Sequence, residues 1–358
     1  MPPHTSCCYR CPICSRGVVG TREAVITIGI VQRFRGNVLV SEQANVDCAA
    51  GFGVRLIGCA DDAVLPIGMH DYAEALGCCM LVDKTMFIAD VLDCDASVVV
   101  CCRPEGFGKS MNLSMLKAFL ERPAVGRSGQ RLFADAQIWD ANGGRYRDEY
   151  ACYPVISLDF SGAARCGAAV AGVVHNALSG ECVRLLPLLE APDLARDKVR
   201  HIERVARGAA SEEEVASVLG VLIELLEMAC DEQVVLLVDG YDAAWLGRAS
   251  ARGASGADPA GLLDRVLFDA IAAAGHSLRF ACLMGECPGP AEAALSLHCC
   301  SYCLTTPLST WCDRWFGFSD AEVQALLNHA GREEYLMMRV NGSRDIGLAG
   351  PIARVQRV

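Results

Sequence analysis

The amino-acid sequence predicts an α/β fold with a mainly parallel sheet flanked by helices. Short apolar segments rich in valine, isoleucine and leucine alternate along the chain with segments of helical periodicity, and this alternation is typical of parallel α/β sheets. One apolar segment leads through a glycine-containing turn directly into a helix. Another apolar segment ends in an aspartate. The alternation predicts the fold class, and the last two features indicate a candidate site at the carboxyl edge of the sheet.

The expected elements become regular from residue 65 onward. Between 65 and 92 the pattern predicts a short helix, a strand at 80–82 and a second helix with an apolar face. Later helices are expected at 112–120 and 212–230, because apolar residues recur there every three or four positions. The remaining strands are expected at 97–102, 153–160, 234–238 and 278–285.

The pattern divides the chain into three parts. Residues 1–60 are expected to form a cysteine-containing N-terminal segment of unassigned fold, 61–330 the main domain and 331–358 a short C-terminal tail. Within the main domain, glycine, serine and alanine predict a surface loop at 248–261. The stretch 293–312 is uncharged but contains serine, threonine, histidine and proline, so we expect it to be irregular.

The composition is that of an acidic globular protein. Of the 358 residues, 52% are hydrophobic and 21% are charged, which is enough apolar material for a core. The net charge of −11 gives no support to nucleic-acid binding. No segment has the length and apolarity of a membrane span, and the N-terminus shows no secretory leader. We therefore expect a cytoplasmic protein without a nucleic-acid or membrane partner, and the sequence identifies no protein partner.

Cysteine is unusually frequent, with 21 residues. A reducing compartment disfavours disulfide bonds, so most of these residues are expected to be buried free thiols. Two clusters contain the C-x2-C spacing of metal ligands. They are Cys7, Cys8, Cys11 and Cys14 near the start, and Cys299, Cys300, Cys303 and Cys312 near the end; at the first, zinc would be held by Cys8, Cys11 and Cys14 with a fourth ligand such as Cys7, His4 or Cys48. The first cluster lacks a second C-x2-C pair nearby, and the later one is typical of compositional grouping, so the sequence favours free thiols over zinc at both.

The turn between the strand 97–102 and the helix 112–120 carries part of a phosphate-binding pattern. It keeps Gly-Lys-Ser at residues 108–110 but has Arg103 where the usual pattern begins with glycine. Helix N-terminal N–H groups, the Lys109 ammonium and the Ser110 hydroxyl can together hold a polyphosphate and Mg²⁺. The candidate nucleotide-binding residues are Arg103, Pro104, Gly106, Phe107, Gly108, Lys109, Ser110 and Met111. The alternative is a simple turn with a surface lysine, and the flanking strand and helix favour the phosphate loop.

The strand 234–238 supplies the other half of the candidate site. It is followed by Asp239, whose carboxylate at the edge of a parallel sheet would point at a metal held by the loop. The alternative is a core strand with a capping aspartate. Because the phosphate-loop pattern lies upstream, we favour the metal role, with Ser110 and Asp239 as candidate Mg²⁺ ligands.

Seven segments carry a family resemblance. In order they are LPIGMHDY, MLVDKTMFIADVL, RPEGFGKSMNLSMLKAFLE, YPVISLDF, VVLLVDGYD, FACLMGE and WFGFSDAEVQALL. They resemble the AAA-ATPase-like domain family, whose P-loop domain usually precedes a PD-(D/E)XK nuclease-like domain. The family's loop begins with Arg-Pro, so the resemblance explains Arg103. It implies a P-loop NTPase-like fold that binds ATP and Mg²⁺, with Lys109 and Ser110 at the phosphates and Asp239 at the metal.

Three departures from the family pattern affect the expected site. Glu105 and Gly106 replace two arginines, which puts a carboxylate near the expected triphosphate and weakens binding. Gly240 replaces the glutamate that would position or activate the attacking water. Met284 replaces a threonine whose hydroxyl could contact the terminal phosphate. The resemblance therefore implies an ATP site in which hydrolysis is impaired.

Three functions remain open from the sequence. The leading hypothesis is an ATP-binding protein with a degenerate hydrolytic site that acts as a nucleotide-dependent binding module. The second is an active ATPase in which Lys109 and a non-standard carboxylate, Asp242 or another one, are catalytic. The third is a degenerate relative without a nucleotide site, or a zinc protein. Nuclease activity is not expected, because residues 331–358 show no strand with paired acidic residues and a lysine.

Overall fold

The computed structural model describes residues 54–58, 66, 68–123, 132–163, 170–250 and 259–329. The early cysteine cluster and the tail at 331–358 lie outside the described residues, so the expectations about them remain predictions. All elements below belong to the part of the chain from Val54 onward.

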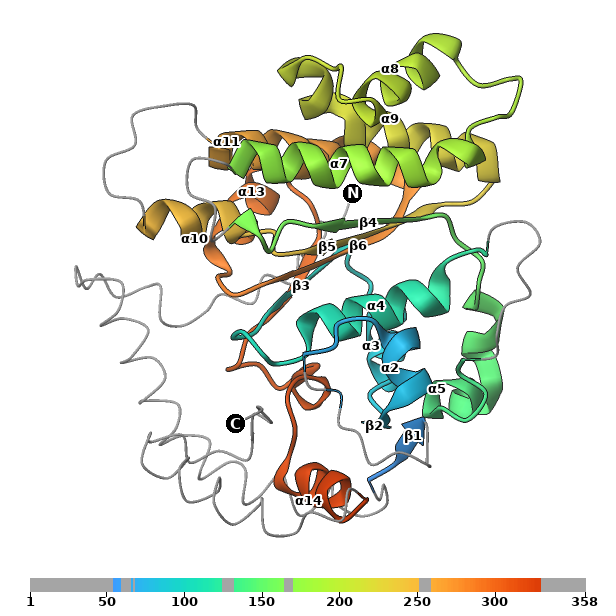
Figure 1. Ribbon diagram of the computed structural model, residues 1–358, viewed down its shortest axis with the longest axis vertical. Helices are drawn as coiled ribbons and strands as arrows, with labels where there is room; N and C mark the ends of the chain where they lie inside the picture. The colour runs from blue at the N-terminus through green and yellow to red at the C-terminus, as the bar shows by residue number, and fades with distance from the viewer. Residues whose placement is uncertain are drawn as a thin grey trace, which may run out of the picture. The chain divides into compact units, whose positions relative to one another are not determined.

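Five strands form one parallel sheet in the order β4-β5-β6-β3-β7 (Figure 1). Their bounds are β3 Val98–Cys102, β4 Val155–Asp159, β5 Val234–Asp239, β6 Leu278–Gly285 and β7 Tyr302–Thr305. The order places β6 between β3 and β5, so the ends of these three strands lie next to one another at the carboxyl edge. The predicted α/β class with a mainly parallel sheet and a P-loop NTPase-like arrangement is confirmed.

Successive residues of the strands pack into two separate apolar cores, one on each face of the sheet. In β3, Val98 and Val100 belong to one core, whereas Val99 and Cys101 belong to the other. All four side chains are completely buried. A strand that is covered on both faces has no solvent-facing side, which explains why these strands are continuous apolar runs instead of alternating ones.

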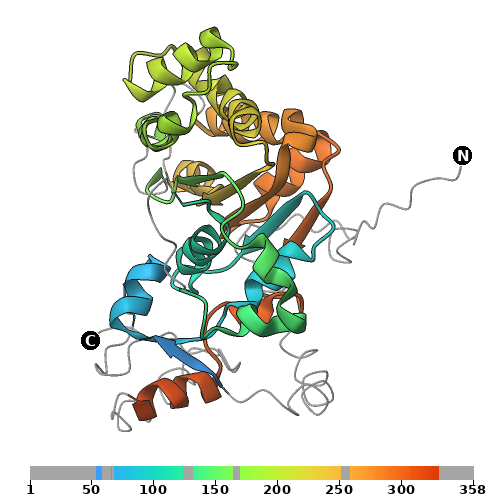
Figure 2. The same ribbon diagram turned by 90° about the vertical axis from the view of Figure 1, so that its right-hand side faces the viewer.

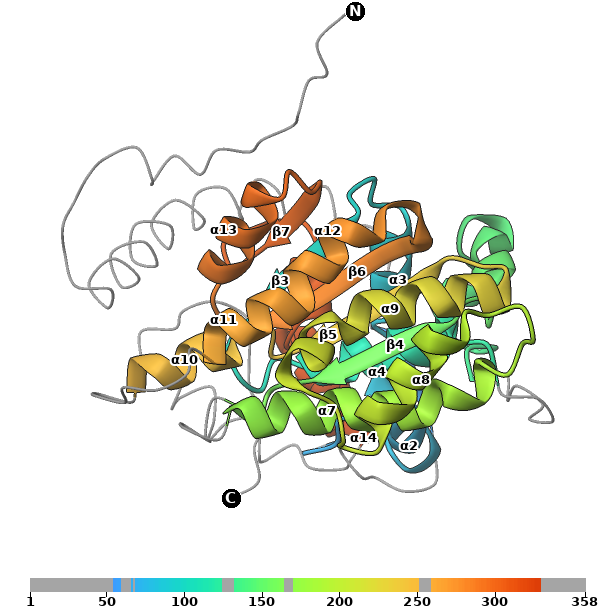
Figure 3. The same cartoon turned by 90° about the horizontal axis from the view of Figure 1, so that it is seen from above.

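Helices cover both faces of the sheet (Figures 1 and 3). On one side lie α7 Val170–Leu185, α8 Arg196–Ala206, α9 Glu212–Cys230, α10 Ala243–Ser250, α11 Pro259–Asp264, α12 Ala270–Ala274 and α13 Gly289–Leu297. On the other side lie α2 Tyr72–Cys78, α3 Met86–Leu92, α4 Lys109–Leu120 and α5 Gln137–Asp140. Helix α8 packs against α7 and α9. Within the described part of the chain, no helix combines the length and apolarity needed to cross a membrane.

A second, smaller sheet and a late helix complete the described fold. Strand β1, Leu56–Gly58, pairs antiparallel with β2, Met80–Val82. Helix α14, Asp320–His329, contacts β2 (Figure 2). Lys84 holds this contact, because its Nζ donates to Glu322 Oε1 at 2.5 Å and to the Arg314 carbonyl oxygen at 2.8 Å.

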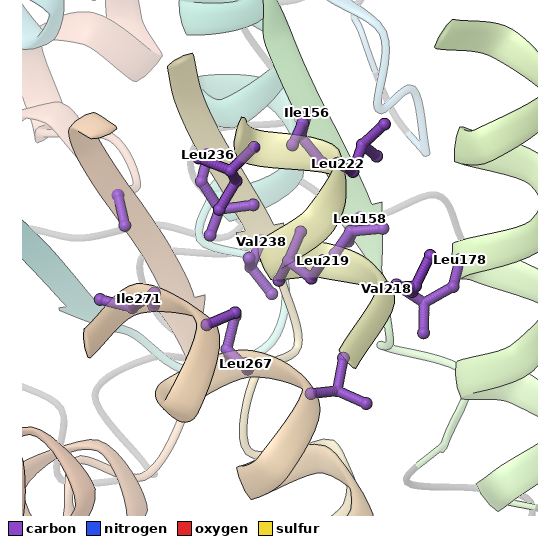
Figure 4. Packing of buried hydrophobic residues seen from close by; sticks show 14 of the residues in the cluster. Ile156, Leu158, Leu178, Val218, Leu219, Leu222, Leu236, Val238, Leu267 and Ile271 are labelled. Carbon is purple, nitrogen blue, oxygen red and sulfur yellow. The ribbon is translucent and has the colours of Figure 1, made fainter. Parts of the chain in front are cut away.

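Helix α9 shows how local sequence signals specify an element. Ser211 and Glu214 form a capping box, in which Ser211 Oγ accepts from the Glu214 N–H at 3.2 Å and Glu214 Oε2 accepts from the Ser211 N–H at 2.9 Å. Figure 4 shows Leu219 and Leu222 of this helix directed toward β5, where Leu236 lies in the same core. The helix has the bounds that the sequence predicted.

Two segments differ from the sequence-based expectation. The stretch 293–312 was expected to be irregular, but it contains β7, which pairs with β3 through the register Val98↔Tyr302 to Cys101↔Thr305. Three of its four residues are only partly buried and the fourth, Thr305, is polar, so the pairing with β3 and not an apolar run makes this segment a strand. The expected loop 248–261 is also shorter than predicted, because α10 continues to Ser250 and α11 begins at Pro259.

We expect Leu222→Ala to lower the free energy of unfolding by about 3 kcal/mol, because the loss of a buried side chain leaves a cavity. Leu222 is 2% exposed, whereas Leu297 on α13 is 80% exposed. Leu297→Ala is therefore the matched control and should change stability by less than about 0.5 kcal/mol. Chemical denaturation measures both variants, and equal losses would contradict the packing of α9 against the sheet.

Candidate functional site

The residues between β3 and α4 form a tight loop at the carboxyl edge of the sheet. Gly106 and Gly108 have φ angles of 82° and 81°, a conformation that residues with a Cβ rarely adopt. A Cβ added at Gly108 would meet no atom within 4 Å, so the backbone conformation and not the available space requires glycine there. The glycine turn expected between a buried strand and a helix lies at this position.

Lys109, the first residue of α4, folds back over the loop. Its Nζ donates to the carbonyl oxygens of Arg103 at 2.7 Å and Pro104 at 3.0 Å. Glu286 Oε1 lies 3.7 Å from the same nitrogen. The first N–H groups of α4 have no partner within the helix, so the ammonium group adds positive charge to the positive end of the helix dipole. This is an arrangement that attracts anions.

Ser110 and Asp239 join the loop to the end of β5. Ser110 Oγ donates a hydrogen bond to Asp239 Oδ2, which connects the start of α4, the helix after β3, with the end of β5. Burial raises the pKa of Asp239, and the negative charge of Asp159 at the end of β4 raises it further. The hydrogen bond from Ser110 lowers the pKa and so opposes both effects. The structure thus brings together the two residues that the sequence suggested as Mg²⁺ ligands, and both are oxygen donors.

The Arg103 side chain is buried. Its guanidinium donates to the Cys102 carbonyl oxygen at 2.8 Å and to Thr305 Oγ1 at 3.0 Å, and it lies 4.7 Å from the centroid of the Phe316 ring. Asp313 lies 3.8 Å from it, and burial lowers the pKa of the guanidinium. Sequence reasoning grouped Arg103 with the nucleotide-binding residues, whereas the structure places its side chain in the packing between the loop and the segment 305–316.

The other residues of the predicted loop divide into an exposed part and an anchored part. Pro104 and Gly106 are exposed. The Phe107 carbonyl oxygen accepts a hydrogen bond from the Gly317 N–H at 3.1 Å, and Met111 packs against the core on the α4 side of the sheet. The outer part of the loop is therefore open to a ligand, while its inner part is held by protein contacts.

Gly240 follows Asp239, at the position where the family that the motifs resemble has glutamate. Its φ is 68°, and its N–H donates to the Met284 carbonyl oxygen at 2.8 Å. A Cβ at this position would lie 2.6 Å from the Ser161 backbone nitrogen and 2.7 Å from its Cα, which is far inside normal contact. A glutamate does not fit this backbone, so its loss is part of how the turn after β5 is built.

Asp242, the substitute carboxylate that the sequence suggested, is engaged inside the protein. Its side chain is 1% exposed, and Oδ2 accepts from the N–H groups of Glu286 at 2.8 Å and Cys287 at 2.5 Å. Burial raises the pKa of Asp242, and the two backbone hydrogen bonds lower it. The carboxylate thus holds the turn after β6. Gly285 leaves room for it, since a Cβ there would lie 2.7 Å from Asp242 Oδ1.

Glu286 belongs to the site, although sequence reasoning did not single it out. It directly follows β6, the strand between β3 and β5, and its side chain is 44% exposed. Its carboxylate approaches Lys109, the residue expected to contact phosphate. The signal in the sequence was of the same kind as for Asp239, an acidic residue at the end of a buried parallel strand.

The later cysteine cluster is divided among different contacts. Cys303 lies in β7 and hydrogen-bonds with Cys94, which lowers the pKa of the Cys94 thiol to about 6. His298 Nε2 lies 3.1 Å from Asp269 Oδ1. Among the residues that the structure describes, no group of three histidine, cysteine or acidic side chains is arranged to hold a metal ion.

The fold and the loop together define the class of protein. It is a P-loop NTPase-like domain with a lysine, a serine and an aspartate at the carboxyl edge of its sheet. A family model described as a predicted AAA-ATPase matches residues 66–288. The chain therefore belongs to this family, and the resemblance inferred from its motifs is confirmed. Comparisons with curated proteins and with solved structures gave no significant match. The family match ends before β7 and α14.

We expect Gly240→Ala to destabilise the protein by about 3 kcal/mol or more, because the added methyl group needs both a left-handed backbone and the space that Ser161 occupies. Gly208→Ala is the matched control. Gly208 has a similar φ of 66°, but a Cβ there would meet nothing within 4 Å. It should cost only about 1–2 kcal/mol of backbone strain. If denaturation shows equal losses for the two variants, the contact with Ser161 is not the cause.

Proposed function

We propose that the chain binds ATP with Mg²⁺ at the loop after β3 and acts as a nucleotide-dependent binding module with impaired hydrolysis. The observation that carries the proposal is the hydrogen bond from Ser110 to Asp239, because it joins a hydroxyl of the loop to a carboxylate at the end of β5. In P-loop NTPases a serine or threonine and an aspartate at these positions hold the metal. Membership of the predicted AAA-ATPase family supports the same assignment.

The residues around the loop fit a triphosphate. The N-terminus of α4 favours negative charge, and the glycines at 106 and 108 let a phosphate approach the backbone. Lys109 now contacts two neutral carbonyl oxygens, and a phosphate oxygen is a stronger partner for an ammonium group. Ser110 and Asp239 would hold Mg²⁺, which supplies positive charge to neutralise the phosphates.

The residues at the positions that would orient the attacking water or contact the terminal phosphate are poorly suited to hydrolysis. Gly240 has no side chain to position a water, and Met284 is buried and brings no hydroxyl to the end of β6. Asp242 is also buried, and one of its oxygens already accepts two backbone hydrogen bonds. General acid–base groups typically contribute about 10²- to 10⁴-fold to a rate, so their absence predicts slow turnover. An active ATPase based on Asp242 is the weaker candidate for this reason.

The cysteine content and the net charge are relevant to the cellular compartment and to the binding partners of the protein. As part of the proposal we place the protein in a reducing compartment such as the cytoplasm, where cysteines remain reduced. The net charge of −11 supports no role in nucleic-acid binding. A binding module of this kind would change its affinity for a protein partner when ATP shifts its population of conformations.

We expect calorimetric titration to show saturable Mg-ATP binding to the full chain, weakened about 10- to 100-fold by Lys109→Ala. The variant loses a charge-assisted hydrogen bond to phosphate. Lys198→Ala is the control, because Lys198 lies on α8 and pairs with Glu224. Absence of binding heat in the folded wild-type protein would reject the nucleotide site and favour the degenerate relative without one.

We expect Glu105→Gln to tighten Mg-ATP binding about three- to tenfold at low salt, because the exposed Glu105 carboxylate repels the phosphates. The gain should shrink as salt is added, since screening weakens the interaction. Glu190→Gln, at another exposed position, controls for the change in net charge. Unchanged or weaker binding by Glu105→Gln would show that this carboxylate does not oppose the ligand.

A further inference from the structure

Several carboxylates lie at the edge of the sheet where ATP would bind. They are Glu105, Asp159, Asp239, Asp242 and Glu286. A group that orients a water for attack on phosphorus must be accessible to water and must have an oxygen that is not already committed to the protein. These two conditions, together with the position of each strand in the sheet, distinguish the five carboxylates.

Two of them are already committed, and a third lies on a more distant strand. Asp239 accepts the hydrogen bond of Ser110 and is the proposed metal ligand. Asp242 is 1% exposed and holds the turn after β6. Asp159 is exposed, and its Oδ1 accepts the Ser161 N–H at 2.8 Å, but it ends β4, which lies three positions from β3 in the sheet, whereas β6 lies next to β3.

Glu105 is exposed but belongs to the loop itself. The loop would surround the phosphates from one side, and the attacking water has to approach in line with the leaving oxygen. A carboxylate within the loop therefore lies on the phosphate side, not on the side of the water. Glu105 opposes binding by its charge, as proposed above, and does not orient water.

Glu286 meets both conditions. Its side chain is 44% exposed, so water reaches it, and Oε1 lies 3.7 Å from Lys109 Nζ. It follows β6, and β6 is the strand between β3, which leads into the loop, and β5, which ends in Asp239. The backbone of Glu286 thus lies between the two halves of the proposed ATP site.

The turn that carries Glu286 is held in place. Asp242 Oδ2 accepts the N–H groups of Glu286 and Cys287, and the Tyr241 hydroxyl donates to the Cys287 carbonyl oxygen at 2.6 Å. Tyr241 and Asp242 are buried, so these bonds are protected from water. A fixed turn lowers the entropy cost of placing a carboxylate next to a reacting atom. Asp242 is therefore a positioning residue for Glu286.

We propose that Glu286 is the water-orienting carboxylate of this chain and that the site retains slow ATP hydrolysis through it. This inference rests on the proposed ATP binding. Glu286 accepts a hydrogen bond from the attacking water, whose oxygen forms a bond to the terminal phosphorus while the bond from that phosphorus to the bridging oxygen breaks. The electron pair of the broken bond leaves with ADP. The proton of the water passes to Glu286 and then to solvent, so the products are ADP, phosphate and a proton.

Glu286 also affects binding, which gives a second readout. Its negative charge lies beside Lys109 and opposes the approach of a terminal phosphate. Glutamine has the same length but no charge. Glu286→Gln should therefore tighten Mg-ATP more than Mg-ADP, because ADP lacks the terminal phosphate.

The experiment measures turnover and calorimetric affinity for wild type, Glu286→Gln and the control Glu292→Gln, which lies on α13 outside the site. We expect Glu286→Gln to lower kcat about 100-fold, the range of a general acid–base group. Its Kd for Mg-ATP should fall about threefold while its Kd for Mg-ADP changes by less than about twofold. Glu292→Gln should match wild type in both measurements.

Different failures have different meanings. Unchanged turnover in Glu286→Gln overturns the inference. The inference is also overturned if Asp159→Asn loses turnover while Glu286→Gln keeps it. If wild type binds Mg-ATP but hydrolyses it no faster than Lys109→Ala, the binding module stands and the role of Glu286 is rejected. If Mg-ATP does not bind at all, both proposals fall.

Discussion

The burial of β3, β6 and β5 on both faces is the constraint on which the candidate site depends. A shift of one residue in any of these strands would exchange the side chains of its two cores, so their register is firmly set. Their carboxyl ends are therefore held side by side. The loop after β3, Gly240 after β5 and Glu286 after β6 meet at one edge for this reason. Apolar residues that take no part in any chemistry determine where the polar groups of the site lie.

Similar carboxylates at this edge have different environments and hence different roles. Burial raises the pKa of Asp239 and of Asp242, and in each case hydrogen bonds to the carboxylate oppose the rise. Ser110 is the donor for Asp239, and two backbone N–H groups of the turn after β6 are the donors for Asp242. Glu286 is partly exposed and stays available to water or to Lys109. Such differences in environment are how one set of carboxylates serves separate purposes.

The turn after β5 is built around two glycines. Gly240 lies against Ser161 in a left-handed conformation, and Gly285 leaves space that Tyr241 and Asp242 fill. The two glycines and the two buried side chains form one packed unit. Restoring a glutamate at position 240 would disturb this unit, so a carboxylate on the neighbouring strand is the arrangement that the backbone allows.

Much of this protein could be predicted from local sequence signals. Apolar runs and helical periodicity predicted the parallel α/β sheet and the helix 212–230, because these signals depend on residues close together in the chain. The proximity of Ser110 and Asp239 was also expected, since parallel strands end at a common edge. The strand β7, the buried Arg103, the clamp formed by Asp242 and the place of Glu286 became clear only in the folded molecule. Each depends on partners far away in the sequence, as Arg103 does on Thr305. Burial and hydrogen-bond partners of this kind arise from the packing of distant segments, which no local pattern encodes.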